Sequence, residues 1–166
     1  MKLFGVVGWK NSGKTTLVAK LVTELKSRNF SVSTIKHAHH AFDLDQPGRD
    51  SYKHREAGAQ EVLICSGTRW ALMHELQGEN EPSLDSLLAK MTPVDIVIIE
   101  GFKGAAHNKI ECCRATTELP LISDENKTIV AIASDTQVDT AGLQVLNLND
   151  VNAIADFVVL KTGLLI

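Results

Sequence analysis

The sequence predicts an α/β domain built on a mostly parallel sheet, and three observations support this fold class. Strand-like apolar runs alternate with amphipathic segments along the 166 residues. One run, DIVIIEG at residues 95–101, is apolar without alternation, which is typical of a strand covered on both faces. The first run, KLFGVV at residues 2–7, leads through a glycine-rich turn into a helical pattern. We therefore expect a single domain over residues 1–166, with helices flanking the sheet.

Beyond that opening strand, the first half of the chain predicts a long helix, a second strand, two short helices and a hairpin. Apolar residues at helical spacing predict a helix over residues 15–28, and FSVSTIK (30–36) predicts the second strand. RDSYKHREAGA predicts a short helix that stops at Gly58, and SLDSLLAKM a helix with Ser83 as its N-cap. Between them, EVLIC and RWALMHEL flank Ser66-Gly67 and predict a hairpin.

The second half predicts further strands and a closing helix. KIECCRA (109–115) is a weaker, more polar strand pattern, which we place at an edge of the sheet. TIVAIASD and LQVLNL are further strand candidates, and DVNAIADFVVLK is amphipathic with helical spacing. The hairpin and the edge strand are expected to add antiparallel pairing.

Composition excludes several classes of protein. With 44% hydrophobic and 22% charged residues and a net charge of −3, the chain resembles an ordinary soluble protein and lacks a general nucleic-acid footprint. No apolar run reaches the roughly 20 residues that span a bilayer, and the N-terminus lacks a signal-peptide pattern. Three cysteines form no disulfide framework, which favours a cytoplasmic protein with reduced thiols.

The strongest motif is GWKNSGKT at residues 8–15, which fits G-x-x-x-x-G-K-[ST] between a strand and a helix. Gly8 and Gly13 let the backbone turn back and direct its N–H groups at phosphate oxygens. Lys14 would reach the outer phosphates, and the Thr15 hydroxyl would bind Mg²⁺. The positive end of the following helix adds to the attraction. The motif predicts a three-layer P-loop NTPase-like fold.

Ligands of open parallel sheets lie beyond the carboxyl ends of the strands, and this rule selects further candidates. Asp95 begins its strand and Glu100 ends it, about 16 Å away at ~3.3 Å per residue, so only Glu100 can face the phosphates. With Lys14, it is the predicted catalytic group: Glu100 would bind Mg²⁺ through water or polarise a water, unless it merely caps the sheet edge.

The same rule brings Ser134 and Asp135, in IASD, to this edge. A carboxylate there could accept hydrogen bonds from the N1–H and amino group of guanine, a pair of donors that adenine lacks. The usual N-K-x-D guanine signature is absent. Asp135 is therefore as readily interpreted as a helix N-cap or turn residue.

A histidine-rich loop, KHAHHAFDLDQPGRD at residues 36–50, follows the second strand. The spacing of His37 and His40 is compatible with Zn²⁺ or Ni²⁺, but no further ligands are evidently placed to complete such a site. Asp43 and Asp45 suit Mg²⁺ better. We favour a switch loop for nucleotide or substrate over an ordinary polar loop or a transition-metal site. In the hairpin, Trp70 and Met73 are expected to be core or dimer contacts rather than a cofactor stack.

Taken together, these motifs resemble the MobB family of molybdopterin-guanine dinucleotide biosynthesis adapters. The resemblance covers SGKTT, IKHAHH with DLDQPGRDSYKHREAGA, RWALM, EGFK, IASD and LNDVNAIADFVV, in that order along nearly the whole chain. It places the family's P-loop on Gly8–Thr16, which includes Asn11, Ser12 and Thr16, and its acidic strand end on Glu100. Its loop carboxylates fall on Asp43, Asp45 and Asp50, and the match does not decide which of them meets Mg²⁺; we take Asp45 as the ligand, with Asp43 and Asp50 as alternatives. The loop histidines His37, His39 and His40 are expected to bind the pterin or to order the loop on GTP.

The resemblance implies a homodimer that binds GTP and Mg²⁺ and supports attachment of GMP to molybdopterin, together with the separate molybdopterin guanylyltransferase. It implies at most a weak intrinsic GTPase. No glutamine in an Asp-x-x-Gly context and no assignable arginine finger is present in the sequence to speed hydrolysis.

Two other classes of function compete with this interpretation. A P-loop small-molecule kinase would need a general base and an arginine-rich lid, and neither can be identified in the sequence. A metal-delivery GTPase would use the histidine loop as its store of ligands and would bind Zn²⁺ or Ni²⁺ stoichiometrically.

Overall fold

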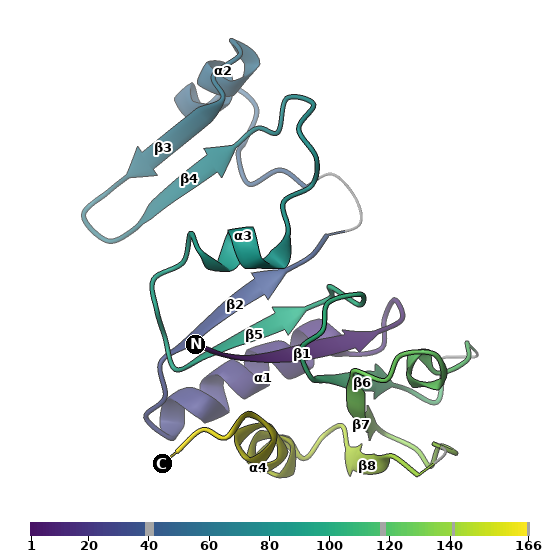
Figure 1. Ribbon diagram of the computed structural model, residues 1–166. Helices are drawn as coiled ribbons and strands as arrows, with labels where there is room; N and C mark the ends of the chain where they lie inside the picture. Colours follow the sequence, from purple (N-terminus) through teal and green to yellow (C-terminus); the bar gives the residue numbers. More distant parts are fainter. Residues whose placement is uncertain (39–41, 117–118, 141, 166) are drawn as a thin grey trace. The chain divides into compact units, whose positions relative to one another are not determined.

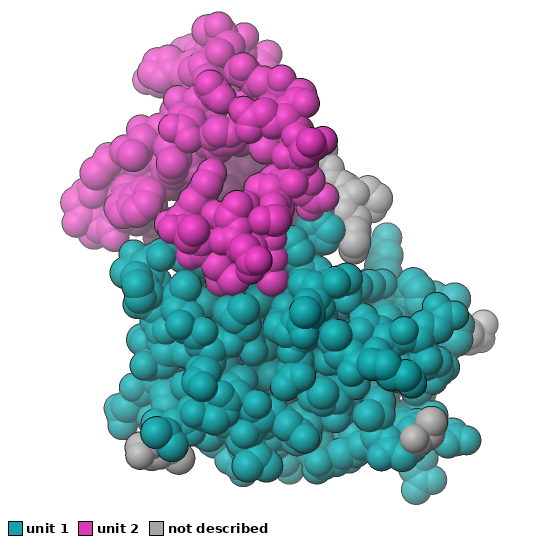
Figure 2. Space-filling model, in the orientation of Figure 1, with its two compact units in different colours: residues 1–37, 91–166 teal, residues 38–90 magenta. Residues whose placement is uncertain are grey.

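The computed structural model describes residues 1–38, 42–116, 119–140 and 142–165. The chain forms two compact units, which Figure 2 shows in different colours. We call residues 1–37 with 91–166 the main unit and residues 38–90 the inserted unit. The expectation of one domain over residues 1–166 stays a prediction.

The main unit is built on a parallel sheet (Figure 1). Its six strands in the described part of the chain are β1 (Lys2–Gly8), β2 (Val32–Lys36), β5 (Ile96–Glu100), β6 (Lys109–Cys113), β7 (Ile129–Ser134) and β8 (Gln144–Asn147). They lie in the order β2-β5-β1-β6-β7-β8, and every neighbouring pair is parallel. Because all six strands point the same way, their carboxyl ends share one edge of the sheet. The antiparallel pairing expected for the KIECCRA strand is therefore wrong.

Alternate residues of the central strands divide between the two faces of this sheet. Phe4, Val6 and Ile98 belong to the larger core, which α1 (Lys14–Ser27) and α4 (Val151–Thr162) cover. Val7 and Ile132 belong to a smaller core on the other face, where residues beside the 3₁₀ helix Ile122–Asp124 cover them. All five residues of β5 are buried, as its continuous apolar run predicted. The predicted class, a mostly parallel sheet flanked by helices with an added antiparallel pair, is confirmed.

The edge position expected for KIECCRA is wrong. Strand β6 lies between β1 and β7, pairs with both in parallel, and has all five residues buried. Its polar residues misled the prediction because the fold satisfies them internally. The Lys109 ammonium donates to the carbonyl oxygens of Ala105 and His107 and to the Thr128 hydroxyl. The Glu111 carboxylate accepts from the N–H groups of Ile122 and Ser123, both at 2.9 Å.

The inserted unit contains α2 (Asp50–Glu56), the antiparallel strands β3 (Glu61–Cys65) and β4 (Trp70–His74), and α3 (Leu84–Leu88). The predicted helix stop is confirmed, since Gly58 has a φ of 97°. The predicted N-cap is also confirmed, because the Ser83 hydroxyl accepts from the Ser86 N–H at 3.2 Å. The hairpin turns at residues 66–69, where the Ser66 hydroxyl oxygen accepts from the N–H groups of two of them.

A half-buried histidine, His107, lies just before β6 and beside the first strand. A side chain at Gly5 would come within 2.7 Å of the His107 ring, so the two elements pack without space between them. Within the described residues, neither buried ring nitrogen of His107 has a hydrogen-bond partner. Burial and the neighbouring Lys109 charge lower the pKa of His107 to about 4. The folded protein therefore holds this imidazole neutral at acidic pH, where an exposed histidine would be charged.

This histidine makes folding stability depend on pH. The unfolded chain binds a proton at His107 below about pH 6.5, whereas the folded chain binds it only near pH 4, so acidification through this window favours unfolding. We expect the wild type to lose roughly 1–3 kcal/mol of unfolding free energy relative to His107→Leu between pH 6.5 and 4, as measured by urea unfolding. The exposed His54, replaced in the same way, is the control. A difference between wild type and His107→Leu that stays constant with pH would contradict this account.

Candidate functional site

The P-loop joins β1 to α1 at the carboxyl edge of the sheet, and its backbone needs both motif glycines. Gly13 has a φ of 96° and serves as the N-cap of α1, and Asn11 also takes a left-handed conformation, with φ of 64°. A Cβ atom at Gly8 would lie 2.5 Å from both the Cys112 carbonyl oxygen and the Ser12 hydroxyl. The turn can therefore close only without a side chain at position 8.

Trp9 ties the P-loop to other loops of the main unit. Its indole N–H donates to the Pro120 carbonyl oxygen at 2.8 Å, and the Lys103 ammonium lies 4.2 Å from the ring centroid. The Trp9 carbonyl oxygen in turn accepts from the Lys14 ammonium at 2.5 Å. Burial lowers the pKa of Lys14, and the nearby Cys112 and Glu100 oppose that shift.

Thr15, Glu100 and Lys36 meet at the adjoining carboxyl ends of β1, β5 and β2. The Thr15 hydroxyl donates to Glu100 Oε1 at 2.8 Å. The Lys36 ammonium lies 3.2 Å from that same carboxylate oxygen and 3.3 Å from the Thr15 hydroxyl. Strand register explains the meeting, since Lys36 and Glu100 are direct partners across β2 and β5. As the sequence predicted, Asp95 lies at the other end of β5. There its carboxylate accepts hydrogen bonds from the Ser31 N–H and hydroxyl.

Thr15 and Glu100 line a pocket of about 530 Å³ within the main unit. Its walls are Lys10, Asn11, Gly13, Lys14, Thr15, Thr16, Glu100 and Arg114. Three of the eight side chains carry a positive charge and one a negative charge, which suits an anionic ligand accompanied by a cation. Ser12 is fully buried beneath the loop, and among the described residues its hydroxyl has no hydrogen-bond partner.

Arg114 is the pocket residue that sequence reasoning missed. It follows β6 directly, and its Nε and Nη2 atoms would lie 3.1 Å from a Cβ atom at Gly13. Its Nη1 atom lies 3.2 Å from Asp135 Oδ2. The rule that identified Glu100 would have found Arg114 as well, but the mistaken edge position for β6 removed that strand end from consideration.

Asp135 does not line the pocket, but it pairs with Arg114, which does. Its second carboxylate oxygen accepts from the Ala115 N–H at 3.0 Å, so both oxygens are already engaged. Ser134 is buried, and its hydroxyl oxygen accepts from the Thr136 N–H at 3.2 Å. Neither residue lines the pocket, whereas Asn11, Gly13, Lys14, Thr15 and Thr16 of the predicted nucleotide contacts do. Their role in reading the base stays a prediction.

His37 is fixed against the segment that follows Glu100. Its backbone N–H donates to the Glu100 carbonyl oxygen at 2.9 Å, and its ring centroid lies 4.7 Å from that of Phe102. Gly101 and Phe102 both have positive φ, 92° and 50°, and the second is costly for a residue with a side chain. His39 and His40 lie outside the described residues. The role of the loop histidines in binding the pterin or in ordering the loop on GTP therefore stays a prediction.

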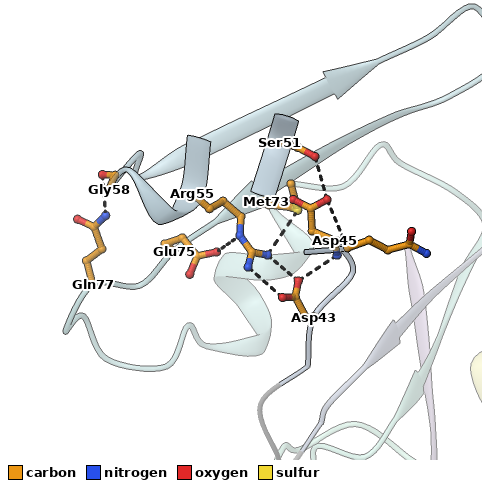
Figure 3. A network of polar contacts seen from close by, with 9 residues as sticks. Asp43, Asp45, Ser51, Arg55, Gly58, Met73, Glu75 and Gln77 are labelled. Atoms are coloured by element: carbon orange, nitrogen blue, oxygen red, sulfur yellow. Dashed lines mark hydrogen bonds and ion pairs between the residues drawn. The ribbon is translucent and has the colours of Figure 1, made fainter. Parts of the chain in front are cut away.

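The three candidate loop carboxylates belong to the inserted unit and differ in their partners. Figure 3 shows two of them, Asp43 and Asp45, with the side chains that they contact. Asp43 pairs with Arg55 at 2.7 Å, and this guanidinium lowers the pKa of the carboxyl. Asp50 pairs with Lys53 and is largely exposed. Asp45 accepts from the Ser51 hydroxyl at 2.8 Å through one oxygen, while its other oxygen is buried and unpaired among the described residues.

The described residues contain no cluster of three or more histidine, cysteine or acidic side chains placed to hold a metal ion. They also contain no helix that is both long and apolar enough to cross a membrane.

Comparisons with known proteins agree with one another. The family model for molybdopterin guanine dinucleotide synthesis protein B, MobB, matches residues 3–135. The molybdopterin-guanine dinucleotide biosynthesis adapter protein of Escherichia coli is 39% identical over 162 residues, covering 95% of this chain and 91% of the relative. Its Haemophilus influenzae counterpart is 38% identical over 159 residues, covering 94% and 86%.

Solved structures show the same relationship. A crystal structure of molybdopterin-guanine biosynthesis protein B superposes with a TM-score of 0.73 at 27% identity, covering 95% of this chain and 97% of the other. Bacillus subtilis MobB gives a TM-score of 0.75 at 24% identity over 98% of both chains, which supports the fold. With the P-loop, the acidic strand end and these matches all in agreement, the chain belongs to the MobB family.

Proposed function

We propose that this chain is a cytoplasmic GTP-binding adapter that assists the attachment of GMP to molybdopterin, acting with the molybdopterin guanylyltransferase. The observation that carries the proposal is the meeting of Lys14, Thr15 and Glu100 at one pocket in a member of the MobB family. The names of the Escherichia coli and Haemophilus influenzae relatives support the pathway. The pocket's residues support the ligand class, because a P-loop binds nucleotide phosphates.

The donor atoms at this pocket fit Mg²⁺. A hydroxyl and a carboxylate oxygen lie 2.8 Å apart at Thr15 and Glu100, and both are ligand types that Mg²⁺ prefers. The Lys36 ammonium, in contact with both, marks the position as one that attracts a cation. Thr15 and Glu100 would hold the ion, which would supply positive charge to the bound phosphates. Asp45 is the proposed carboxylate from the inserted unit, because Arg55 already neutralises Asp43.

The side chains that surround the phosphates support binding more than hydrolysis. Lys14 supplies charge for the phosphates, and Thr15 and Glu100 supply oxygen ligands for the metal ion. Among the described residues that line this pocket there is no glutamine to orient an attacking water. We therefore propose at most a weak intrinsic GTPase, with bound nucleotide serving the partner enzyme.

A second copy of this chain is the proposed partner of the β3–β4 hairpin. Leu63 pairs across the strands with Leu72, and Cys65 with Trp70, so the four side chains share one face. Leu63, Trp70 and Leu72 are 61%, 66% and 46% exposed. An isolated two-stranded sheet is marginally stable in water, so an apolar face of this kind gains by being covered. Met73 is half-buried and contacts Arg55 instead.

Lys14 should be required for tight nucleotide binding. Replacing it with alanine removes the cation that would face the outer phosphates, so Mg²⁺-dependent GTP binding should weaken by more than about tenfold in calorimetric titration. Lys20→Ala, on an exposed face of the same helix, is the matched control and should bind like the wild type. Equal affinity of the wild type for ATP and GTP, with no effect on the guanylyltransferase reaction, would refute the proposed function.

Lys36 should compete with Mg²⁺. Because its ammonium occupies the space next to the Thr15 hydroxyl and Glu100 carboxylate, Lys36→Met should lower the Mg²⁺ concentration needed for half-maximal GTP binding. The lysine side chain is 58% exposed, so the effect should be modest, about twofold to fivefold. Lys20→Met serves as control. An unchanged or higher Mg²⁺ requirement in Lys36→Met would show that the lysine does not compete.

Trp70 should control self-association. A charged residue in this apolar face would have to be buried on pairing, so Trp70→Glu should weaken dimerisation by roughly thirtyfold or more in sedimentation velocity. Leu160→Glu, which alters another exposed apolar residue on α4 of the main unit, should leave association unchanged. Dimerisation of Trp70→Glu at the affinity of the wild type would place the interface elsewhere.

A further inference from the structure

The pair formed by Arg114 and Asp135 has no assigned role in nucleotide binding beyond the predicted base contact of Asp135. Arg114 leaves the sheet next to the P-loop, because β6 pairs with β1 and Cys112 is the register partner of Gly8. Its side chain forms a wall of the pocket that also contains Lys14, Thr15 and Glu100. An arginine in this position can donate several hydrogen bonds in a fixed planar geometry that matches phosphate oxygens.

The guanidinium is divided between two neighbours. Its Nη1 edge meets Asp135 Oδ2 at 3.2 Å, whereas Nε and Nη2 lie against the P-loop backbone at Gly13. A Cβ atom at Gly13 would be 3.1 Å from each of those nitrogens, so the glycine lets the guanidinium approach the start of α1. Among the described residues, no carboxylate contacts the Nε and Nη2 edge of the guanidinium, and this edge faces the P-loop.

Asp135 has the geometry of a support for this arginine. One of its oxygens is fixed by the backbone N–H of Ala115, the residue that follows Arg114, and the other accepts from Arg114 itself. Each oxygen therefore already accepts a hydrogen bond from within the protein, and the two contacts hold the carboxylate in place beside Arg114. The side chains of Arg114 and Asp135 are 36% and 25% exposed, so the pair is accessible from the pocket yet partly shielded from water.

We propose that Arg114 binds the phosphates of the nucleotide and that Asp135 positions it, rather than reading the base. The inference rests on the proposed nucleotide-binding function. It adds the Arg114 guanidinium, at the end of the neighbouring strand β6, to the cations of the P-loop. Guanine selectivity then comes from other contacts. Loss of a charge-assisted hydrogen bond of this kind weakens binding affinity by about tenfold to a hundredfold.

Titrations with GTP and GMP test the phosphate contact. Arg114→Ala should weaken GTP binding by about tenfold to a hundredfold and GMP binding by much less, with Arg114→Lys intermediate. Arg28→Ala, which removes an arginine paired with Glu24 and Asp156 at the far end of α1, is the matched control. Equal losses for GTP and GMP, or no loss for either, would overturn the proposal. Melting temperatures without nucleotide establish that the variants fold.

Xanthosine triphosphate separates the two roles of Asp135. Xanthine carries a carbonyl in place of the guanine amino group, so an asparagine at a base-reading position can donate to it where a carboxylate cannot. If Asp135 positions Arg114, Asp135→Asn should weaken GTP and xanthosine triphosphate binding by the same factor. A switch of preference to xanthosine triphosphate would show that Asp135 reads the base and would overturn the inference. Failure of the unmodified protein to bind GTP with Mg²⁺ would instead refute the proposed function.

Discussion

The parallel pairing of β1 with β5 on one side and with β6 on the other is the constraint on which the site depends. This pairing ends three strands at one edge of the sheet, so the P-loop, Glu100 and Arg114 emerge as neighbours although they lie far apart in the sequence. The pairing of β2 with β5 adds Lys36 by direct register with Glu100. A shift of one residue in any of these registers would turn the corresponding side chain to the opposite face.

Charge in the pocket is balanced around one carboxylate. Glu100 is 7% exposed and accepts from the Thr15 hydroxyl, while Lys36 provides an ionic partner and Lys14 lies close enough to affect it electrostatically. Burying a carboxylate away from water is unfavourable unless it is paired. These partners offset the loss of hydration before any ligand binds. A phosphate group and its cation would then replace contacts that already exist, rather than create a charged site in an apolar one.

Tight packing around the P-loop limits which side chains its neighbours can carry. Gly8 is held against the Cys112 carbonyl oxygen, and burial raises the pKa of the Cys112 thiol to about 12, so this residue acts as an unreactive part of the core. Gly13 has no side chain, and this lets the Arg114 guanidinium contact the loop at that position. The two motif glycines thus allow two different close approaches by the same strand, β6.

The sequence by itself determined the phosphate loop, the end of β5 that carries Glu100, the hairpin and both short helices, because local spacing and turn residues specify each of them. Only the tertiary structure decided the place of β6. Lys109 and Glu111 looked like edge residues, since several of the oxygens and N–H groups that satisfy them come from segments 11 to 19 positions away. That long-range compensation is invisible to local pattern, and Arg114 was missed with it. The paired state of Asp135 likewise follows from the adjacency of β6 and β7, which no residue pattern in either strand encodes.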